Sequence, residues 1–266
     1  MRNIHDAALE CLLASAPDEK CRLTHALWLA GRDRVLMTAG AEAEAIAINA
    51  PGRPERPLLV PPRELERRRP ATPEGQAALI HALTHIEFNA INLALDAVYR
   101  FRNLPEAFYN DWMQVADEEA THFLLLRNHL RALGYEYGDF PAHDGLWEMA
   151  QKTAHDVVAR MALVPRCLEA RGLDVTPGIK IKLVNCGDRA AAAILDVILR
   201  DEIGHVAIGD RWFKYACDQL QLEPEATFRT LLDEYFVGDL KGPFHIEARR
   251  KAGFSEAELA YLEQDC

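Results

Sequence analysis

Apolar residues recur every three to four positions along most of this chain, and no segment shows the alternation typical of a half-buried strand. This pattern predicts helices over residues 73–101, 105–133 and 145–170. A fourth long helix is predicted from Asp188, which is suited to cap it, to about residue 220. The pattern therefore predicts an all-α protein built around a bundle of four helices.

Proline and glycine divide the second half of this pattern. Pro165 lies inside the third predicted helix and should kink it, and Gly172 should end it. Thr176 and Pro177 are then expected to open a short helix that ends near Gly187. We therefore expect the third helix to be shortened on one side of the bundle.

Segments of a different character flank the predicted bundle. Residues 1–50 predict two weakly organised helices, and 51–70 hold six prolines and six arginines, which favours an extended arm. After the bundle, one helix is expected from Pro224 to near Val237, and Ser255 should cap a last short helix. The sequence thus predicts three parts: an N-terminal extension over 1–70, a four-helix bundle over 71–221 and a C-terminal helical extension over 222–266.

Composition and charge narrow the class of protein. The 266 residues are 49% hydrophobic and carry a formal net charge of −11, which disfavours nucleic-acid binding except through the arginine-rich arm at 51–70. No uncharged apolar run reaches the roughly 20 residues of a membrane helix, and Asp6 and Glu10 interrupt any secretory signal. The six cysteines form no C-x-x-C pair and are expected to be reduced. We therefore expect a cytoplasmic protein that does not contact a membrane.

Two of the predicted helices carry the same motif of metal-binding residue types. Glu119 and His122 form one E-x-x-H motif, and Glu202 and His205 form another. Positions i and i+3 lie on one face of a helix, so both side chains of a pair can reach the same metal centre. A single copy arises by chance in many helical proteins, whereas two copies in helices of similar length favour a metal site.

A further carboxylate precedes each motif at nearly the same interval. Glu87 lies 32 positions before Glu119, and Glu169 lies 33 positions before Glu202. Four-helix di-metal centres take one Glu from each of two helices and a Glu-x-x-His pair from each of the other two. The sequence therefore predicts two helical hairpins around a di-metal centre whose ligands are Glu87, Glu119, His122, Glu169, Glu202 and His205.

The helix faces around three of these carboxylates favour a buried site. Glu87, Glu119 and Glu202 each lie in the middle of an apolar stripe that offers no Arg or Lys partner. The stripes include Ile80, Leu83, Ile91 and Leu95; Trp112, Val115 and Leu126; and Leu195, Ile198 and Phe213. Because an isolated carboxylate is costly to bury, a metal ion is favoured over hydrogen-bonded carboxylates.

The stripe around Glu169 is less apolar, and alternatives stay open there. Arg166 could pair with Glu169 as a plain salt bridge, and His155 or Asp156 could supply the ligand instead. The acids before the motifs, Glu118 and Asp201, either accept hydrogen bonds from ligand imidazoles or lie on the surface.

Other residues resemble site residues but are interpreted more simply. His81 and His85 have the spacing of a metal pair, yet they point away from the face of Glu87 and are expected to be surface or packing residues. His129 lies two turns from His122, about 10 Å away, which is too far for the same centre. Trp112 is expected to be part of the core.

With its two E-x-x-H motifs, the chain resembles the ferritin-like superfamily and, within it, an uncharacterised bacterial family. The resemblance covers nearly all of the chain after residue 50 and implies a ferritin-like bundle with a di-metal centre at the six residues named above. The acids before the motifs are similar to those of soluble acyl-carrier-protein desaturases, although Thr121 and Gly204 replace the Arg of those enzymes. The layout also looks like that of tRNA-modifying di-iron hydroxylases. The matching stretches include HALTHIEFNAINLALDAVYRF, ARMALVPRCLEARGLDVTPG, ILDVILRDEIGHVAIGDRWF and KGPFHIEARRKAGFS.

From the residues and the resemblance together we expect an oxygen-activating oxidoreductase or hydroxylase with two iron or manganese ions per chain and an unknown substrate. The alternatives are a ferritin-like protein that oxidises or handles iron without an organic substrate, a tRNA-modifying hydroxylase-like enzyme, and a scaffold with a vestigial site. The expected partners are a small-molecule or macromolecular substrate and an electron donor. Because the two extensions should cover outer faces of the bundle, we expect a monomer or small homo-oligomer.

Overall fold

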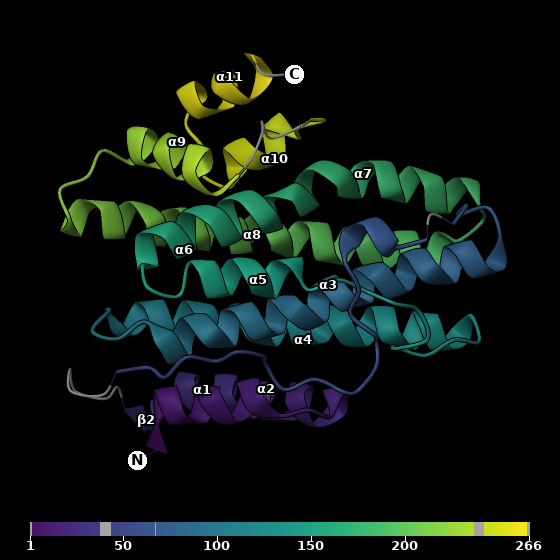
Figure 1. Ribbon diagram of the computed structural model, residues 1–266, viewed down its shortest axis with the longest axis horizontal. Coiled ribbons are helices and arrows are strands. Elements are labelled where there is room, and N and C mark those ends of the chain that lie inside the picture. Colours follow the sequence, from purple (N-terminus) through teal and green to yellow (C-terminus); the bar gives the residue numbers. More distant parts are fainter. Residues whose placement is uncertain (1, 38–43, 67, 237–241, 265–266) are drawn as a thin grey trace. The chain divides into compact units, whose positions relative to one another are not determined.

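The computed structural model describes residues 2–37, 44–66, 68–236 and 242–264, and most of these are helical (Figure 1). The expectation of a helical protein is therefore confirmed, apart from one pair of two-residue strands that was not predicted. The chain forms two compact units, Met1–Gln151 and Lys152–Cys266. The four-helix bundle and its expected limits at residues 70 and 221 stay predictions. Within the described ranges, the helices lack the combination of length and apolar character that crossing a bilayer requires.

The first unit is built on a helical hairpin. Its helices are α3 (Pro73–Arg100) and α4 (Glu106–Ala132), which pack along each other as Figure 1 shows. Thr72 caps α3 by accepting a hydrogen bond from Gly75 N (3.1 Å). Both helices match the predicted ranges to within about a residue, because their apolar stripes are long and uninterrupted.

Two shorter helices cover the hairpin. These are α1 (Ile4–Leu13), which packs on α3, and α2 (Pro17–Arg32), which packs on α4. The buried Lys20 donates through Nζ to the carbonyl groups of Cys11 (3.0 Å) and Leu12 (2.7 Å) at the end of α1. The two-residue strands β1 (Arg2–Asn3) and β2 (Leu36–Met37) pair in parallel beside these helices. Tertiary packing thus organises this region more firmly than its sequence pattern indicated.

The proline-rich arm is extended, as predicted, apart from one 3-10 turn, η1 (Pro62–Glu64). A parallel bridge joins it to the loop after α4, where Val60 N donates to Ala142 O (2.8 Å) and Ala142 N donates to Leu58 O (3.0 Å). The same loop leads into α5 (Gly145–Lys152). The arm is therefore an ordered part of the first unit; its Arg67 lies outside the described residues.

Residues 145–185 differ most from the sequence prediction. In place of one helix over 145–170, the chain forms α5, then α6 (Val157–Leu163) and a π-helical turn, η2 (Val164–Glu169). The following helix, α7 (Ala170–Asn185), runs through both Gly172 and Pro177. The expected helix end at Gly172 and the separate helix from Thr176 are therefore wrong.

Packing on α8 (Arg189–Gln219) explains this departure. Pro165 has no amide hydrogen and its ring crowds the preceding turn, which the wider π turn accommodates. A Cβ on Gly209 of α8 would overlap the Pro165 ring, so η2 approaches α8 closely. The buried Leu173 and Leu183 hold α7 in helical form, and this burial outweighs the low helix propensity of its glycine and proline.

The other predicted helices are present. Asp188 caps α8 by accepting from Ala191 N (2.9 Å). The helix expected from Pro224 to near Val237 is α9 (Pro224–Tyr235); Val237 itself is outside the described residues. Ser255 caps the last helix, α11 (Glu256–Gln264), in a capping box in which Glu258 N donates to Ser255 Oγ (3.1 Å) and Ser255 N donates to Glu258 Oε2 (2.8 Å). A further short helix, α10 (Ile246–Lys251), was not predicted.

Candidate metal centre

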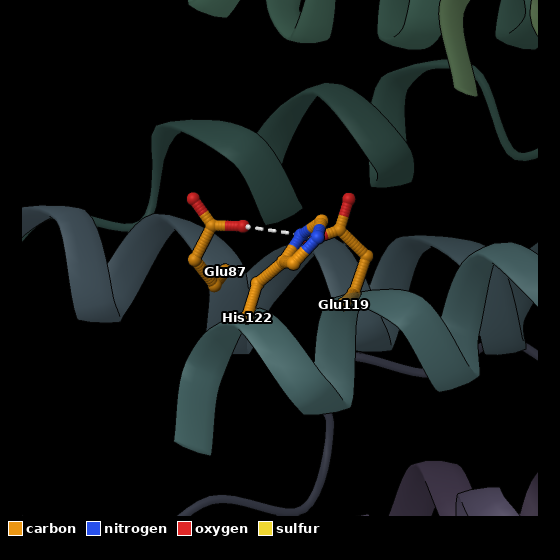
Figure 2. A group of neighbouring side chains, drawn as sticks. All are labelled: Glu87, Glu119 and His122. Carbon is orange, nitrogen blue, oxygen red and sulfur yellow. Dashed lines mark hydrogen bonds and ion pairs between the residues drawn. The ribbon is translucent and has the colours of Figure 1, made fainter. Parts of the chain in front are cut away.

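Three of the predicted ligands meet inside the first unit. Glu87 lies in the middle of α3, and Glu119 and His122 lie one turn apart on α4. Nδ1 of His122 is 3.4 Å from Oε2 of Glu87 and 3.4 Å from Oε2 of Glu119. Figure 2 shows the three side chains converging from the two helices. We call these three residues the N-terminal ligand group; a ligand atom from each lies within 4.8 Å of the others.

Burial gives this group unusual protonation properties. Glu87 is 4% exposed, and burial, followed by repulsion from Glu119, raises its pKa to about 8. Burial opposes a charge on His122, but hydrogen bonding and attraction from both carboxylates outweigh it and raise the pKa of His122 to about 11. The group therefore holds protons tightly when no metal is bound, because burial disfavours an isolated carboxylate charge. Two carboxylates and one imidazole are donors that a divalent metal ion accepts once these protons leave.

The other three predicted ligands lie in the second unit. Glu202 and His205 are one turn apart on α8, with Nδ1 of His205 at 3.8 Å from Oε2 of Glu202. Glu169 is the last residue of η2, which packs on α8. We call Glu169, Glu202 and His205 the C-terminal ligand group. All three are buried, although their ligand atoms do not all lie within 4.8 Å of one another in the described chain.

The alternatives to Glu169 find other roles in the structure. Asp156 caps α6 by accepting from Val158 N (2.8 Å), and His155 is exposed. Arg166 pairs with Asp210 and Glu258. Glu169 therefore stays the predicted ligand from this part of the chain.

Residues interpreted as packing side chains are indeed buried. His81 accepts a hydrogen bond from Gly138 N (2.9 Å), and Nδ1 of His85 lies 2.8 Å from the Tyr137 hydroxyl. Burial lowers the pKa of each of these histidines to about 4, so both are neutral. Trp112 is 2% exposed and belongs to the core, as expected.

The two acids before the motifs have partners on their own helices. Glu118 accepts from Nε2 of Gln114 (2.9 Å), and Asp201 accepts from Nε of Arg200 (2.8 Å). Both acids are half-buried, and their role toward the ligand imidazoles stays a hypothesis.

A set of buried charges in the second unit has almost no signature in the sequence. Arg166 and Arg249 are almost completely buried, and their partners Asp210, Glu258 and Asp174 are also buried. These partners lie on different helices, far apart in sequence, so helical periodicity carries no signal for them. Only the position of Arg166 inside an otherwise apolar stretch, ALVPRCL, pointed to a buried cation.

Comparison with known proteins assigns the chain to a family. Residues 13–260, which include both ligand groups, match the family described as "Protein of unknown function (DUF455)". A Haemophilus influenzae protein described as uncharacterized is 48% identical over 260 residues, covering 94% of this chain and 90% of the relative. No solved structure gave a significant match. The chain therefore belongs to the DUF455 family of proteins of unknown function.

Proposed function

We propose that this protein is a ferritin-like di-metal carboxylate protein that activates oxygen as an oxidoreductase or hydroxylase. The observation that carries the proposal is the buried N-terminal ligand group, in which two glutamates from different helices approach one histidine. In this proposal the N-terminal group binds one metal ion and the C-terminal group binds the other.

The donor set favours iron or manganese. Four carboxylates and two imidazoles are harder ligands than the thiolates that select zinc or copper(I). The four carboxylates carry four negative charges, which two divalent ions would neutralise, so both groups can stay buried. Two redox-active ions, when bound, supply the electron transfer to dioxygen that this chemistry requires.

The protein's own residues prepare the first site. Because Nδ1 of His122 already lies 3.4 Å from each glutamate, the three side chains need little rearrangement to bind a common ion. Ile91 and Val115, fully buried and about one turn from Glu87 and Glu119, exclude water from the same helix faces. This exclusion strengthens electrostatic binding within the site.

Segments outside the ligand-bearing helices favour an enzyme over an iron store. In the first unit α1 and α2 pack on α3 and α4, and in the second α9 and α10 pack on α8. Cage-forming ferritins use such outer faces for contacts between subunits. The arginine-rich arm gives weaker support to a tRNA substrate, because Arg68 already pairs with Glu66 (2.7 Å) and Glu74 (3.2 Å).

Metal analysis tests the proposal directly. The full-length chain, reconstituted anaerobically with Fe²⁺ and desalted, should retain about two ions per chain, as in other four-helix di-metal proteins. Glu119→Gln should lower this content, whereas Glu106→Gln, at an exposed position in the first turn of the same helix, should not. Substoichiometric metal in the wild-type chain would contradict the proposal.

Addition of Fe²⁺ in air distinguishes an oxygen-activating enzyme from an iron-storage protein. An enzyme should oxidise about two Fe²⁺ per chain and then stop, and light scattering should report a monomer or small oligomer. Oxygen consumption with added reductants would then identify conditions for turnover. A particle of several hundred kilodaltons that takes up many irons per chain would establish the storage alternative instead.

A further inference from the structure

A buried arginine stands inside the π-helical turn of the second unit. Arg166 of η2 is 0% exposed, and its guanidinium pairs with Asp210 of α8 (Nε to Oδ1, 3.0 Å) and with Glu258 of α11. Its Cζ also lies 4.6, 4.2 and 4.8 Å from the ring centres of Phe213, Phe228 and Phe254. One side chain of η2 therefore contacts α8, α9, α11 and the turn between α10 and α11.

The two carboxylates that hold this arginine are themselves fixed. Oε2 of Glu258 accepts from Ser255 N (2.8 Å), and Oδ2 of Asp210 accepts from Nζ of Lys214 (2.7 Å). Lys214 also donates to Gly253 O (2.8 Å), and a Cβ on Gly253 would overlap the carboxylate of Asp210. The turn between α10 and α11 is therefore shaped to lie against these carboxylates.

A second buried pair joins the C-terminal helices to α7. Arg249 of α10 donates through Nε and Nη2 to the two oxygens of Asp174 (2.9 and 2.7 Å). Asp174 also accepts from His245 N (2.9 Å). A charged pair with two parallel hydrogen bonds fixes direction as well as distance.

Glu169 lies between these two pairs, three residues after Arg166 and five before Asp174. We propose that α10 and α11 position Glu169 for metal binding, by holding Arg166 through Glu258 and Asp174 through Arg249. These four are positioning residues, since they act on the metal site through Glu169. The inference rests on the proposed function of the C-terminal ligand group.

Stability alone is a weak reason for such a network. Desolvation offsets much of the attraction within a buried ion pair, and apolar residues of similar volume often stabilise a fold better. Directional contacts do, however, hold a segment that helix geometry cannot fix. The π turn interrupts the regular hydrogen-bond pattern just before Glu169, whereas Glu87 lies within an unbroken α-helix.

Mn²⁺ binding to the full-length chain tests this role. Glu258→Gln keeps the side-chain shape and the hydrogen bond from Ser255 but removes the charge that faces Arg166. In this variant, one of the two Mn²⁺ ions should bind about 10- to 100-fold more weakly, which is the range for residues that orient metal ligands. Only the electron paramagnetic resonance signal of that ion should change. The matched control is Glu256→Gln on the same helix, where the exposed pair with Arg250 (2.6 Å) is lost; Mn²⁺ affinity should not change.

Two further variants keep the test decisive. Glu258→Asp retains the charge on a shorter side chain. It should therefore lower the affinity for the same Mn²⁺ ion less than Glu258→Gln does. In a Glu169→Gln background, Glu258→Gln should cause no further weakening, because its effect passes through that carboxylate. An equal loss in both backgrounds, or wild-type Mn²⁺ binding in the single variant, would overturn the positioning role.

Hydrogen exchange distinguishes failure of this inference from failure of the proposed function. In the metal-free protein, Glu258→Gln should speed amide exchange over residues 164–176 relative to wild type and Glu256→Gln. A wild-type chain that binds no Mn²⁺ would refute the proposed function and this inference with it. Normal wild-type binding with unchanged exchange in Glu258→Gln would refute the positioning role alone.

Discussion

The N-terminal and C-terminal ligand groups rest on helices that are built differently. Glu87, Glu119 and His122 come from α3 and α4, which both run unbroken through the ligand positions. In the C-terminal group only α8 is unbroken, and Glu169 ends a π turn between two helices. The two groups therefore share a sequence spacing but not a local structure.

Equal spacing of the ligands along the chain therefore has different physical causes in the two groups. In the hairpin of α3 and α4, helix geometry and an apolar interface bring the three side chains together without distant help. Around Glu169, the backbone follows the packing of Pro165 on Gly209 and the buried pairs made by Arg166 and Arg249. The first group is thus determined locally, and the second depends on residues far along the chain.

Metal removal should have the largest effect on stability, because it acts on both groups at once. A ligand present at about 1,000 times its dissociation constant stabilises the folded state by about 4 kcal/mol, and the emptied carboxylates must also take up protons. Calorimetry with and without a chelator should therefore show a clear loss of melting temperature. Glu119→Ala should behave like the chelated protein; identical melting curves for loaded and chelated wild type would argue against a buried metal site.

Disturbing the packing of η2 on α8 should cause the next largest loss of stability. A matched control position lies on the same helix, α8. Gly209→Ala places a methyl group against the Pro165 ring and should destabilise the protein by about 1–3 kcal/mol, as overpacked sites do. Gly204→Ala meets nothing within 4 Å and should stabilise the helix by up to about 1 kcal/mol. Urea unfolding measures the free energy of unfolding of both variants. Equal changes at the two positions would mean that η2 can shift away from α8 with no loss of stability.

The N-terminal ligand group should make metal-dependent stability depend on pH. Without metal, the folded-state pKa of Glu87 is raised from 4.5 to about 8, so its proton stabilises the metal-free fold below pH 4.5 and this contribution is lost as the pH rises toward 8. Metal binding replaces that proton, so the gap between loaded and chelated protein should widen with pH. The slope is at most about 1.4 kcal/mol per pH unit for each proton.

Melting temperatures at about pH 5, 6, 7 and 8, with and without chelator, measure this gap. Titrating groups outside the two ligand groups, such as Lys20, are present in both forms, so their contributions should cancel in the difference. Glu87→Gln should flatten the pH dependence of the gap. A gap that narrows as the pH rises would contradict the assignment of Glu87 as a ligand.

Helix capping gives the smallest effect in this comparison. Removing an N-cap side chain costs about 1 kcal/mol on average. The loss of stability in Asp188→Ala should exceed that average because Asp188 is buried. The loss in Thr72→Ala should fall below it because Thr72 is exposed. Urea unfolding of the two variants compares the starts of α8 and α3, and a larger cost at Thr72 would reverse the expected order.

Helices with local sequence signals could be predicted from the sequence. The ranges of α3, α4 and α8 follow from long apolar stripes, with Asp188 capping α8, and Ser255 marks the start of α11. The meeting of Glu87 with Glu119 and His122 also follows from these signals. Helix geometry fixes which residues share a face, and a short connection places two such faces against each other.

The path of the chain around Glu169 depends on tertiary packing. Gly172 predicted a helix end and Thr176 with Pro177 predicted a new helix start, yet α7 runs through all three, because burial against α8 outweighs local propensity. The π turn and the pairing of Arg166 with Glu258, 92 residues away, left no periodic mark in the sequence. Propensity and periodicity report interactions within a few residues, whereas burial of a charge depends on whichever distant partners the folded chain brings to it.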